Sequence, residues 1–269
     1  MKQQAGPQVP GRTTWTMTTS DYGPVADLYD AYVRVEFDLD FFAERARRRS
    51  GALLDLMAGT GRVSRVLWRG DRRLTCVDRS LKMLRVLRRR FRDRKPGPEI
   101  VCADIRALPL AADHYALAVI PFNSFAELTS PEDRSRALHE VRDVLAPGGR
   151  LICTLHNPAI RMRTLDGEPR LLGRYELPRR RKLEVRVRGS LDARTGLARS
   201  EQRLRVYGSG GELDEERVQV VDFALITQAD FLSLAGAEGF ETEELLGDYD
   251  GSAFRPGTSP YMIWTLVKA

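Results

Sequence analysis

From residue 51 onward, short apolar runs alternate with amphipathic stretches of helical period. This alternation predicts strand-helix-strand units and a parallel sheet. The helix expected to begin at Ser130 has a capping serine, a proline at its first position and two acidic residues in its first turn. The strands expected in the first part of this region are Ala52 to Met57, Arg73 to Val77, Ile100 to Cys102, Tyr115 to Ile120 and Arg150 to Leu155.

After Asn157 the pattern changes from helical period to period two. Three stretches, 182–188, 202–207 and 217–225, alternate apolar and polar residues and are separated by glycines, which predicts a three-stranded antiparallel meander. The strand-helix alternation then resumes with a helix after Thr227 and two strands at 240–246 and 261–267. A short link without a helix joins these two strands, so the last pair is expected to be antiparallel.

These patterns predict three parts of the chain. Residues 1–20 are expected to be a flexible tail, because they show neither period. Residues 21–162 and 227–269 are expected to form one core domain, into which 163–226 is inserted as an antiparallel β subdomain. Positive charge concentrates in 161–205 and negative charge in 212–250, so ion pairs between neighbouring strands are expected there.

Composition restricts the class of protein further. A chain of 269 residues with 42% hydrophobic residues is large enough for a substantial core. It has no run of 18 apolar residues and no secretory signal pattern, so we expect a cytoplasmic protein without a membrane partner. The three cysteines stand singly in apolar stretches, which predicts buried thiols rather than a disulfide or a metal site. The net charge of +6 permits nucleic-acid binding, but we interpret the arginine-rich stretch 85–94 as a solvated helix face and expect no nucleic-acid partner.

Residues that could bind a ligand follow the first two strands of the predicted sheet. The turn that ends in Gly59-Thr60-Gly61 allows close approach of a ligand to the backbone, and the next helix N-terminus offers hydrogen-bond donors. Asp78 ends the second strand, where a carboxylate can accept hydrogen bonds from two ribose hydroxyls. A dinucleotide fingerprint would need a third glycine where Ser64 stands, so this pattern disfavours a nicotinamide cofactor.

Three further motifs follow in a fixed order: Ala103-Asp104-Ile105 after the third strand, Pro121-Phe122-Asn123 after the fourth, and Pro147-Gly148-Gly149 before the fifth. The ordered series resembles the class I S-adenosylmethionine-dependent methyltransferases, and the inserted sheet resembles that of small-molecule N-methyltransferases. This resemblance implies a Rossmann-like, doubly wound α/β fold whose seven-stranded sheet has an antiparallel last strand. It also implies S-adenosylmethionine as the cofactor and methyl transfer to an amine or hydroxyl of a small molecule, such as a secondary metabolite or an amino sugar.

The resemblance also implies which residues bind the cofactor. One departure is Met57, which stands where the family usually has glycine. The tyrosines that precede the first sheet strand are expected either to cover the cofactor or to pack a helix on the domain. The implied cofactor-binding residues are Tyr32, Asp55, Met57, Ala58, Gly59, Gly61, Asp78, Arg79, Met83, Asp104, Ile105, Pro121 and Phe122.

Methyl transfer is an in-line displacement, so alignment of the acceptor is expected to supply most of the acceleration and a catalytic base is optional. The candidates for catalytic roles are Asn123 as an orienting group, with Glu127 and His156 as proton acceptors. The inserted subdomain is expected to select the substrate or to form homodimer contacts. Two alternatives remain at this point, an RNA or protein methyltransferase and a non-catalytic protein that binds S-adenosylmethionine.

Overall fold

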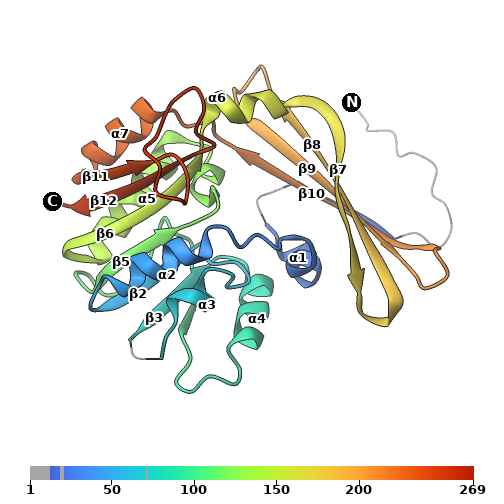
Figure 1. Cartoon of the computed structure of the whole chain (residues 1–269), viewed down its shortest axis with the longest axis horizontal. Helices are drawn as coiled ribbons and strands as arrows, with labels where there is room; N and C mark the ends of the chain where they lie inside the picture. The colour runs from blue at the N-terminus through green and yellow to red at the C-terminus, as the bar shows by residue number, and fades with distance from the viewer. Residues whose placement is uncertain (1–12, 19–20, 71) are drawn as a thin grey trace.

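The computed structural model describes residues 13–18, 21–70 and 72–269, which form two sheets with helices around one of them (Figure 1). The larger sheet has seven strands in the order β11-β12-β6-β5-β2-β3-β4. β12 is antiparallel to both of its neighbours, and every other adjacent pair is parallel. The predicted Rossmann-like fold with an antiparallel last strand is therefore confirmed. The strands are β2 (Ala52–Leu56), β3 (Leu74–Asp78), β4 (Glu99–Cys102), β5 (Tyr115–Ile120), β6 (Leu145–His156), β11 (Phe240–Leu246) and β12 (Tyr261–Lys268).

Helices cover both faces of this sheet. Phe42 of α2 (Leu39–Arg47), Leu67 of α3 (Ser64–Leu67) and Leu87 of α4 (Leu81–Arg90) belong to the core on one face. The other core contains Leu138 of α5 (Pro131–Val144) and Phe231 of α7 (Gln228–Ala237). All five residues of β2 are buried, as expected for a parallel strand that is covered on both sides. The predicted cap of α5 is present, because the Ser130 side chain accepts a hydrogen bond from the Asp133 amide at 3.1 Å.

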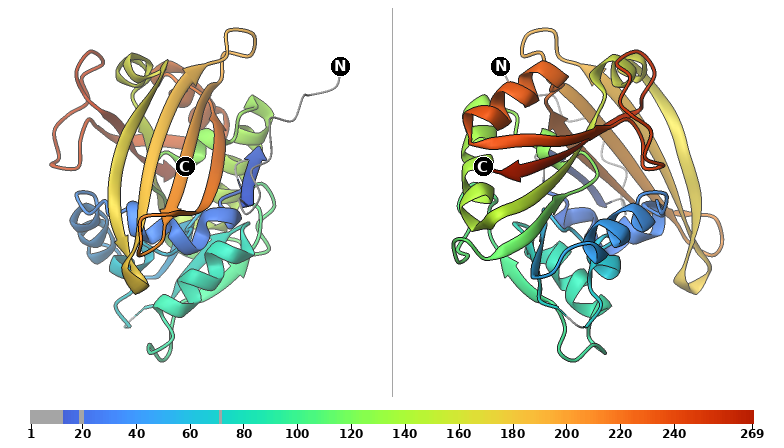
Figure 2. Two further views of the ribbon diagram at one scale, coloured as in Figure 1. Left: turned by 90° about the vertical axis from the view of Figure 1, so that its right-hand side faces the viewer. Right: turned by 60° about the vertical axis from the view of Figure 1, so that its left-hand side comes forward.

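The second sheet has five strands in the order β1-β10-β9-β8-β7 and lies beside the first (Figures 1 and 2). The three predicted strands are present as β8 (Arg181–Leu191), β9 (Ala198–Tyr207) and β10 (Leu213–Phe223). A fourth inserted strand, β7 (Asp166–Leu177), was not predicted, because its sequence contains Pro169 and Gly173 and does not alternate. Its position at the sheet edge tolerates both residues.

The expectation of a flexible tail is wrong for residues 13–18. These residues form β1 (Thr13–Thr18), which pairs in parallel with β10. The pairing explains the error, because a single edge strand takes its partner from a distant segment, here with Thr13 opposite Glu215, and needs no periodic pattern of its own. The rest of that predicted tail, residues 1–12 and 19–20, lies outside the described residues.

Helix α1 (Ala26–Tyr32) lies between the two sheets (Figure 1). Leu28 and Tyr32 of this helix pack in a third core with Leu183, Leu204 and neighbouring residues on the inner face of the second sheet. The Tyr32 hydroxyl also donates a hydrogen bond to Gln202 Oε1 at 3.1 Å. Through this helix, the chain that precedes β2 packs against the inserted sheet.

Two predictions about the side chains can be compared with the structure. The expected cross-strand ion pairs are present in the second sheet, as between Arg205 and Glu216 at 2.6 Å. Cys76 and Cys153 are buried as expected, but Cys102 is exposed, because it ends β4 at the edge of the sheet. Among the described residues, no helix is both long and apolar enough to cross a membrane.

Candidate active site

A cavity opens at the carboxyl ends of β2, β3, β4 and β5. The space between its lining residues, together with its open mouth, amounts to about 820 Å³. The strand ends and the residues that precede β2 both contribute to its wall. The lining residues are Tyr22, Tyr29, Met57, Gly59, Val77, Asp78, Arg79, Ser80, Met83, Ala103, Asp104, Ile105, Phe122, Ser124, Glu127 and Leu128.

Asp78 is held rigidly in this wall. Its two carboxylate oxygens each accept a backbone hydrogen bond of 2.8 Å, from the amides of Gly59 and Ser80. Burial raises the pKa of Asp78, while these two amides and the charge of Arg79 act in the opposite direction. Each oxygen keeps a further lone pair, so the carboxylate can still accept hydrogen bonds from two hydroxyl groups of a ligand.

The glycine-rich turn after β2 adopts backbone conformations that favour glycine. Gly59 has a φ of 58° and Gly61 has a φ of 80°. At Gly61 a Cβ atom would also lie 2.8 Å from Leu87 Cγ, so this glycine lets α4 pack closely against the turn. Met57 has a φ of 54°, which shows that the methionine takes the left-handed conformation that a glycine would adopt easily. The departure from the family pattern therefore changes the side chain in the cavity wall and keeps the turn.

Asp55 lies behind this turn and does not line the cavity. Its Oδ2 atom accepts a hydrogen bond of 2.5 Å from the Ser64 hydroxyl, and its Oδ1 atom is buried without a partner among the described residues. Burial raises the pKa of this carboxyl to about 7. Asp55 thus supports the turn through Oδ2, and its Oδ1 atom could accept a hydrogen bond from a donor that approaches through the turn.

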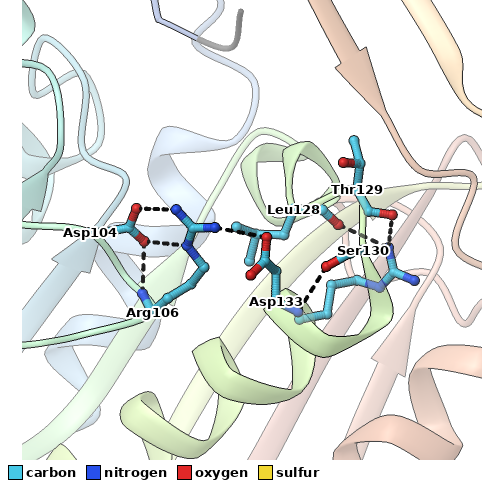
Figure 3. Close-up of polar contacts among 7 residues, drawn as sticks. Asp104, Arg106, Leu128, Thr129, Ser130 and Asp133 are labelled. Atoms are coloured by element: carbon cyan, nitrogen blue, oxygen red, sulfur yellow. Dashed lines mark hydrogen bonds and ion pairs between the residues drawn. The ribbon is translucent and has the colours of Figure 1, made fainter.

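Asp104 is fixed by an arginine that the sequence did not indicate (Figure 3). The Arg106 guanidinium donates to both oxygens of Asp104 at 2.9 and 2.7 Å, and its third nitrogen donates to Asp133 at 2.7 Å. Hydrogen bonds from Arg106 are the main reason that the pKa of Asp104 is lowered. The charge of Asp104 is therefore neutralised locally, and its orientation in the cavity wall depends on Arg106.

We expect Arg106→Gln to weaken the binding of an adenosine ligand in this cavity by about 1 kcal/mol, because the pair is a third exposed and screened by water. Isothermal titration with S-adenosylhomocysteine measures the effect. Asp133→Asn serves as the control, since it removes only the outer partner of Arg106. Equal binding by Arg106→Gln and the unaltered protein would show that Asp104 does not depend on this arginine.

Glu127 is a second carboxyl group in the cavity wall. It follows β5 in the short helix η2 (Ser124–Glu127) and accepts a hydrogen bond of 3.1 Å from the Tyr22 hydroxyl. Burial raises the pKa of Glu127 to about 7, aided by the charge of Asp78, whereas Tyr22 and Arg79 lower it. A carboxyl group with this pKa exchanges its proton near neutral pH, as a general base requires.

Several predicted site residues lie away from the cavity. Tyr32 is packed under the second sheet, and Tyr22 and Tyr29 line the cavity in its place. The apolar pattern of the sequence could not separate these tyrosines, because Tyr22 precedes α1 and both faces of this helix contact protein. Ala58, Gly61 and Pro121 belong to the turns behind the wall and do not line it.

Asn123 and His156 also lie outside the cavity lining. The Asn123 side chain accepts a hydrogen bond of 2.8 Å from the His156 backbone amide, so in this structure it joins the loop after β5 to the end of β6. Phe122 and Asn123 have φ values of 61° and 63°, a strained conformation that occurs often near functional sites. Asn123 therefore positions the backbone, and the structure does not place it against the cavity.

Residues 21–38 form a covering segment that is tied to the glycine-rich turn. The Thr60 hydroxyl donates to Asp30 at 2.6 Å, and Arg62 forms a two-pronged ion pair with Asp38 at 2.5 and 2.6 Å. The Arg62 guanidinium also lies over the Phe122 ring, 5.0 Å from its centroid. Arg62 thus connects the covering segment, the turn after β2 and the loop after β5, a role that no sequence motif indicated.

The comparisons with known proteins agree with this geometry. Residues 53–149 match the family described as "Methyltransferase domain". This segment of the chain is similar in sequence to methyltransferase domains. The chain is 34% identical over 145 residues to a ubiquinone/menaquinone biosynthesis C-methyltransferase of Acidiphilium cryptum, across 53% of this chain and 57% of that protein. It therefore spans little more than half the length of this curated relative.

The likeness to solved structures extends over nearly the whole chain. An S-adenosylmethionine-dependent methyltransferase from Clostridium acetobutylicum has a TM-score of 0.76 at 17% identity, over 91% of this chain and 98% of that one. The sugar N-methyltransferase KedS8 from a Streptoalloteichus species has a TM-score of 0.72 at 20% identity, over 100% and 99% of the two chains. At these identities the likeness concerns the fold, which includes the inserted sheet.

The residues present fit S-adenosylmethionine. Asp78 retains free lone pairs for two hydroxyl groups, and the unpartnered Oδ1 atom of Asp55 lies behind the turn that would hold the amino acid portion. Ile105 and Met83 supply apolar walls next to Asp104. The sequence had not indicated Ser80, Ser124 and Leu128, although the first of these follows Asp78 by two residues and holds its carboxylate.

Proposed function

We propose that this methyltransferase moves the methyl group of S-adenosylmethionine to an amine of a small molecule. The observation that carries the proposal is the cavity at the strand ends, in which Asp78 is fixed between two backbone amides and the covering segment forms the opposite wall. The small-molecule class is supported by the full-length likeness to a sugar N-methyltransferase. An O-methyl transfer remains the alternative for the acceptor atom.

The residues of the chain act mainly by position in this proposal. The bound cofactor supplies an activated methyl group on a sulfonium. Asp78 would hold the ribose, Asp104 and Ile105 would contact the adenine, and the turn from Asp55 to Gly61 would surround the methionine portion. Tyr22 and Tyr29 close the cavity from the covering segment, which excludes water and places electron-rich rings near the cation.

Glu127 is the proposed proton acceptor. An ammonium acceptor must lose a proton before its lone pair can attack the methyl carbon, and Glu127 is the lining carboxyl group whose pKa is raised to about 7. The alternative base is His156, but burial lowers its pKa to about 4, which makes it a weaker base at neutral pH. The inserted sheet would then close the acceptor side or form a homodimer contact.

We expect S-adenosylhomocysteine to bind the protein and Asp78→Ala to weaken this binding by about 1–3 kcal/mol, because two buried amides and two ribose hydroxyls lose their acceptor. Isothermal titration measures the change. Asp93→Ala is the matched control, since Asp93 carries the same charge and its side chain is 87% exposed.

The outcome separates the ribose assignment from general damage. A thermal melt of each variant shows whether Asp78→Ala remains folded, and Asp78→Asn keeps the shape of the side chain if it does not. Unchanged affinity in a folded Asp78 variant would remove the ribose assignment. Binding without methyl transfer to any member of a broad panel of amines and hydroxyl compounds would favour a non-catalytic protein.

A further inference from the structure

Arg161 is a partly buried cation without a carboxylate partner among the described residues. It ends the short helix α6 (Pro158–Arg161), directly after β6. Its Nε atom is buried and makes no hydrogen bond, and its Nη1 atom donates only to the Thr164 hydroxyl at 3.0 Å. Its guanidinium lies over the Phe223 ring, 5.3 Å from the centroid. Burial lowers the pKa of Arg161, and no acidic residue offsets that effect.

His156 is an unpartnered group next to Arg161. Its Nδ1 atom is buried and has no hydrogen-bond partner among the residues that the structure describes, while its ring packs near that of Tyr261 at a centroid distance of 5.9 Å. The positive charge of Arg161 is close enough to lower the pKa of His156, in addition to the effect of burial. Each of these two side chains therefore has one buried nitrogen without a partner among the described residues, an arrangement that costs folding free energy unless a ligand completes it.

This pair lies outside the cavity lining, between the end of β6 and the first inserted strand, β7. His156 is held by Asn123, which follows Phe122 of the cavity wall. Phe223 belongs to β10, so Arg161 also contacts the inserted sheet, and Figure 1 shows α6 at the junction of the two sheets. Asn157 donates to the carbonyl groups of Pro256 and Ser259, both at 2.8 Å, which brings the loop before β12 to the same place.

We propose that Arg161 and His156 form an oxyanion subsite that holds a carboxylate or phosphate group of the methyl acceptor. The proposal rests on the proposed function and specifies its substrate class, an amine that also carries a negative charge. The planar guanidinium can donate two parallel hydrogen bonds to either oxyanion, and a neutral imidazole adds one donor. No carboxylate among the described residues pairs with Arg161, so the acceptor itself would neutralise its charge.

The test uses the protein saturated with S-adenosylhomocysteine and titrated with inorganic pyrophosphate and, separately, with succinate. We expect one of the two probes to bind, pyrophosphate if the acceptor is a phosphate ester and succinate if it is a carboxylic acid. Arg161→Gln should weaken that binding about tenfold or more, and Arg161→Lys should retain part of it. Arg163→Gln is the control, since Arg163 is exposed two residues away and should change the affinity less than about twofold.

Other results would contradict the proposed oxyanion subsite. Absence of binding by both probes, or equal losses in the Arg161 and Arg163 variants, would show that no specific oxyanion site exists. Arg161→Gln should melt no lower than the unaltered protein, because an unpaired cation does not stabilise the fold, and a large drop would assign Arg161 a structural role instead. Binding of S-adenosylhomocysteine is measured first. If the protein does not bind it, the proposed function is refuted. If the protein binds it but binds neither oxyanion probe, only the subsite is refuted.

Discussion

Replacing Arg62 by alanine is expected to destabilise the protein by about 3–5 kcal/mol, because the substitution leaves Asp38 as an unpaired buried carboxylate. The Asp38 side chain is 0% exposed and the Arg62 side chain is 13% exposed, so water cannot replace the lost partner. Arg62 also donates to the Val35 carbonyl at 3.0 Å, and that carbonyl loses its donor as well. The free energy of unfolding in urea, measured at neutral pH, gives the size of the effect.

The chain provides a matched control for this prediction. Arg65 pairs with Glu36 at 2.8 Å and joins the same two segments, but the two side chains are 40% and 73% exposed. Arg65→Ala should therefore cost less than about 1 kcal/mol. The double variant Arg62→Met with Asp38→Leu should recover much of the loss, since it removes both charges together. Similar effects of Arg62→Ala and Arg65→Ala would show that burial of the Arg62–Asp38 pair does not matter.

Arg62→Ala should also affect ligand binding in the cavity. Tyr22 and Tyr29 line it from the covering segment, which Arg62 fastens to the glycine-rich turn. We therefore expect Arg62→Ala to weaken S-adenosylhomocysteine binding although Arg62 is not a lining residue. Arg65→Ala should leave that binding unchanged.

Glu127→Gln is expected to change how stability depends on pH. The pKa of Glu127 is about 7 in the folded protein, compared with an ordinary value of 4.5. Between these two pH values the folded protein keeps a proton that the unfolded chain has lost, so this group contributes stability below about pH 4.5 that disappears as the pH rises through about 7. The glutamine cannot ionise and does not show this loss.

The stability of Glu127→Gln relative to the unaltered protein should therefore grow by roughly 2 kcal/mol between about pH 5 and pH 8. Asp55 titrates in the same range, because its pKa is also about 7, but it is present in both proteins and cancels from the difference. The same substitution at the exposed Glu241 is the control and should leave the pH dependence unchanged. A constant difference between Glu127→Gln and the unaltered protein across this range would show that Glu127 ionises at its ordinary pKa.

Catalysis provides a second measurement on the same variant. If Glu127 accepts the proton of the methyl acceptor, the rate of methyl transfer should rise with pH through about 7 in the unaltered protein. That rise should be absent in Glu127→Gln. If the rate of Glu127→Gln still rises with pH, water or another group accepts the proton.

The sequence by itself determined the large sheet and the identity of most of the cavity wall. Apolar periodicity is a local property, so β2 to β6 could be recognised strand by strand. In a parallel sheet, the residues that follow such strands meet at one edge, which is why Asp78, Asp104 and Phe122 were predicted together and line one cavity. The glycine-rich turn was recognisable because its φ values admit few residue types.

Only the tertiary structure decided the contacts between segments far apart in the chain. The pairing of β1 with β10, the burial of Tyr32 under the second sheet and the ion pair of Arg62 with Asp38 depend on where long connections bring their ends. The roles of Arg106 and Arg161 differ because Arg106 pairs with two carboxylates, whereas Arg161 pairs with none in the part of the chain that the structure describes. A charge acquires its function from its partners and its solvent exposure, and folding sets both.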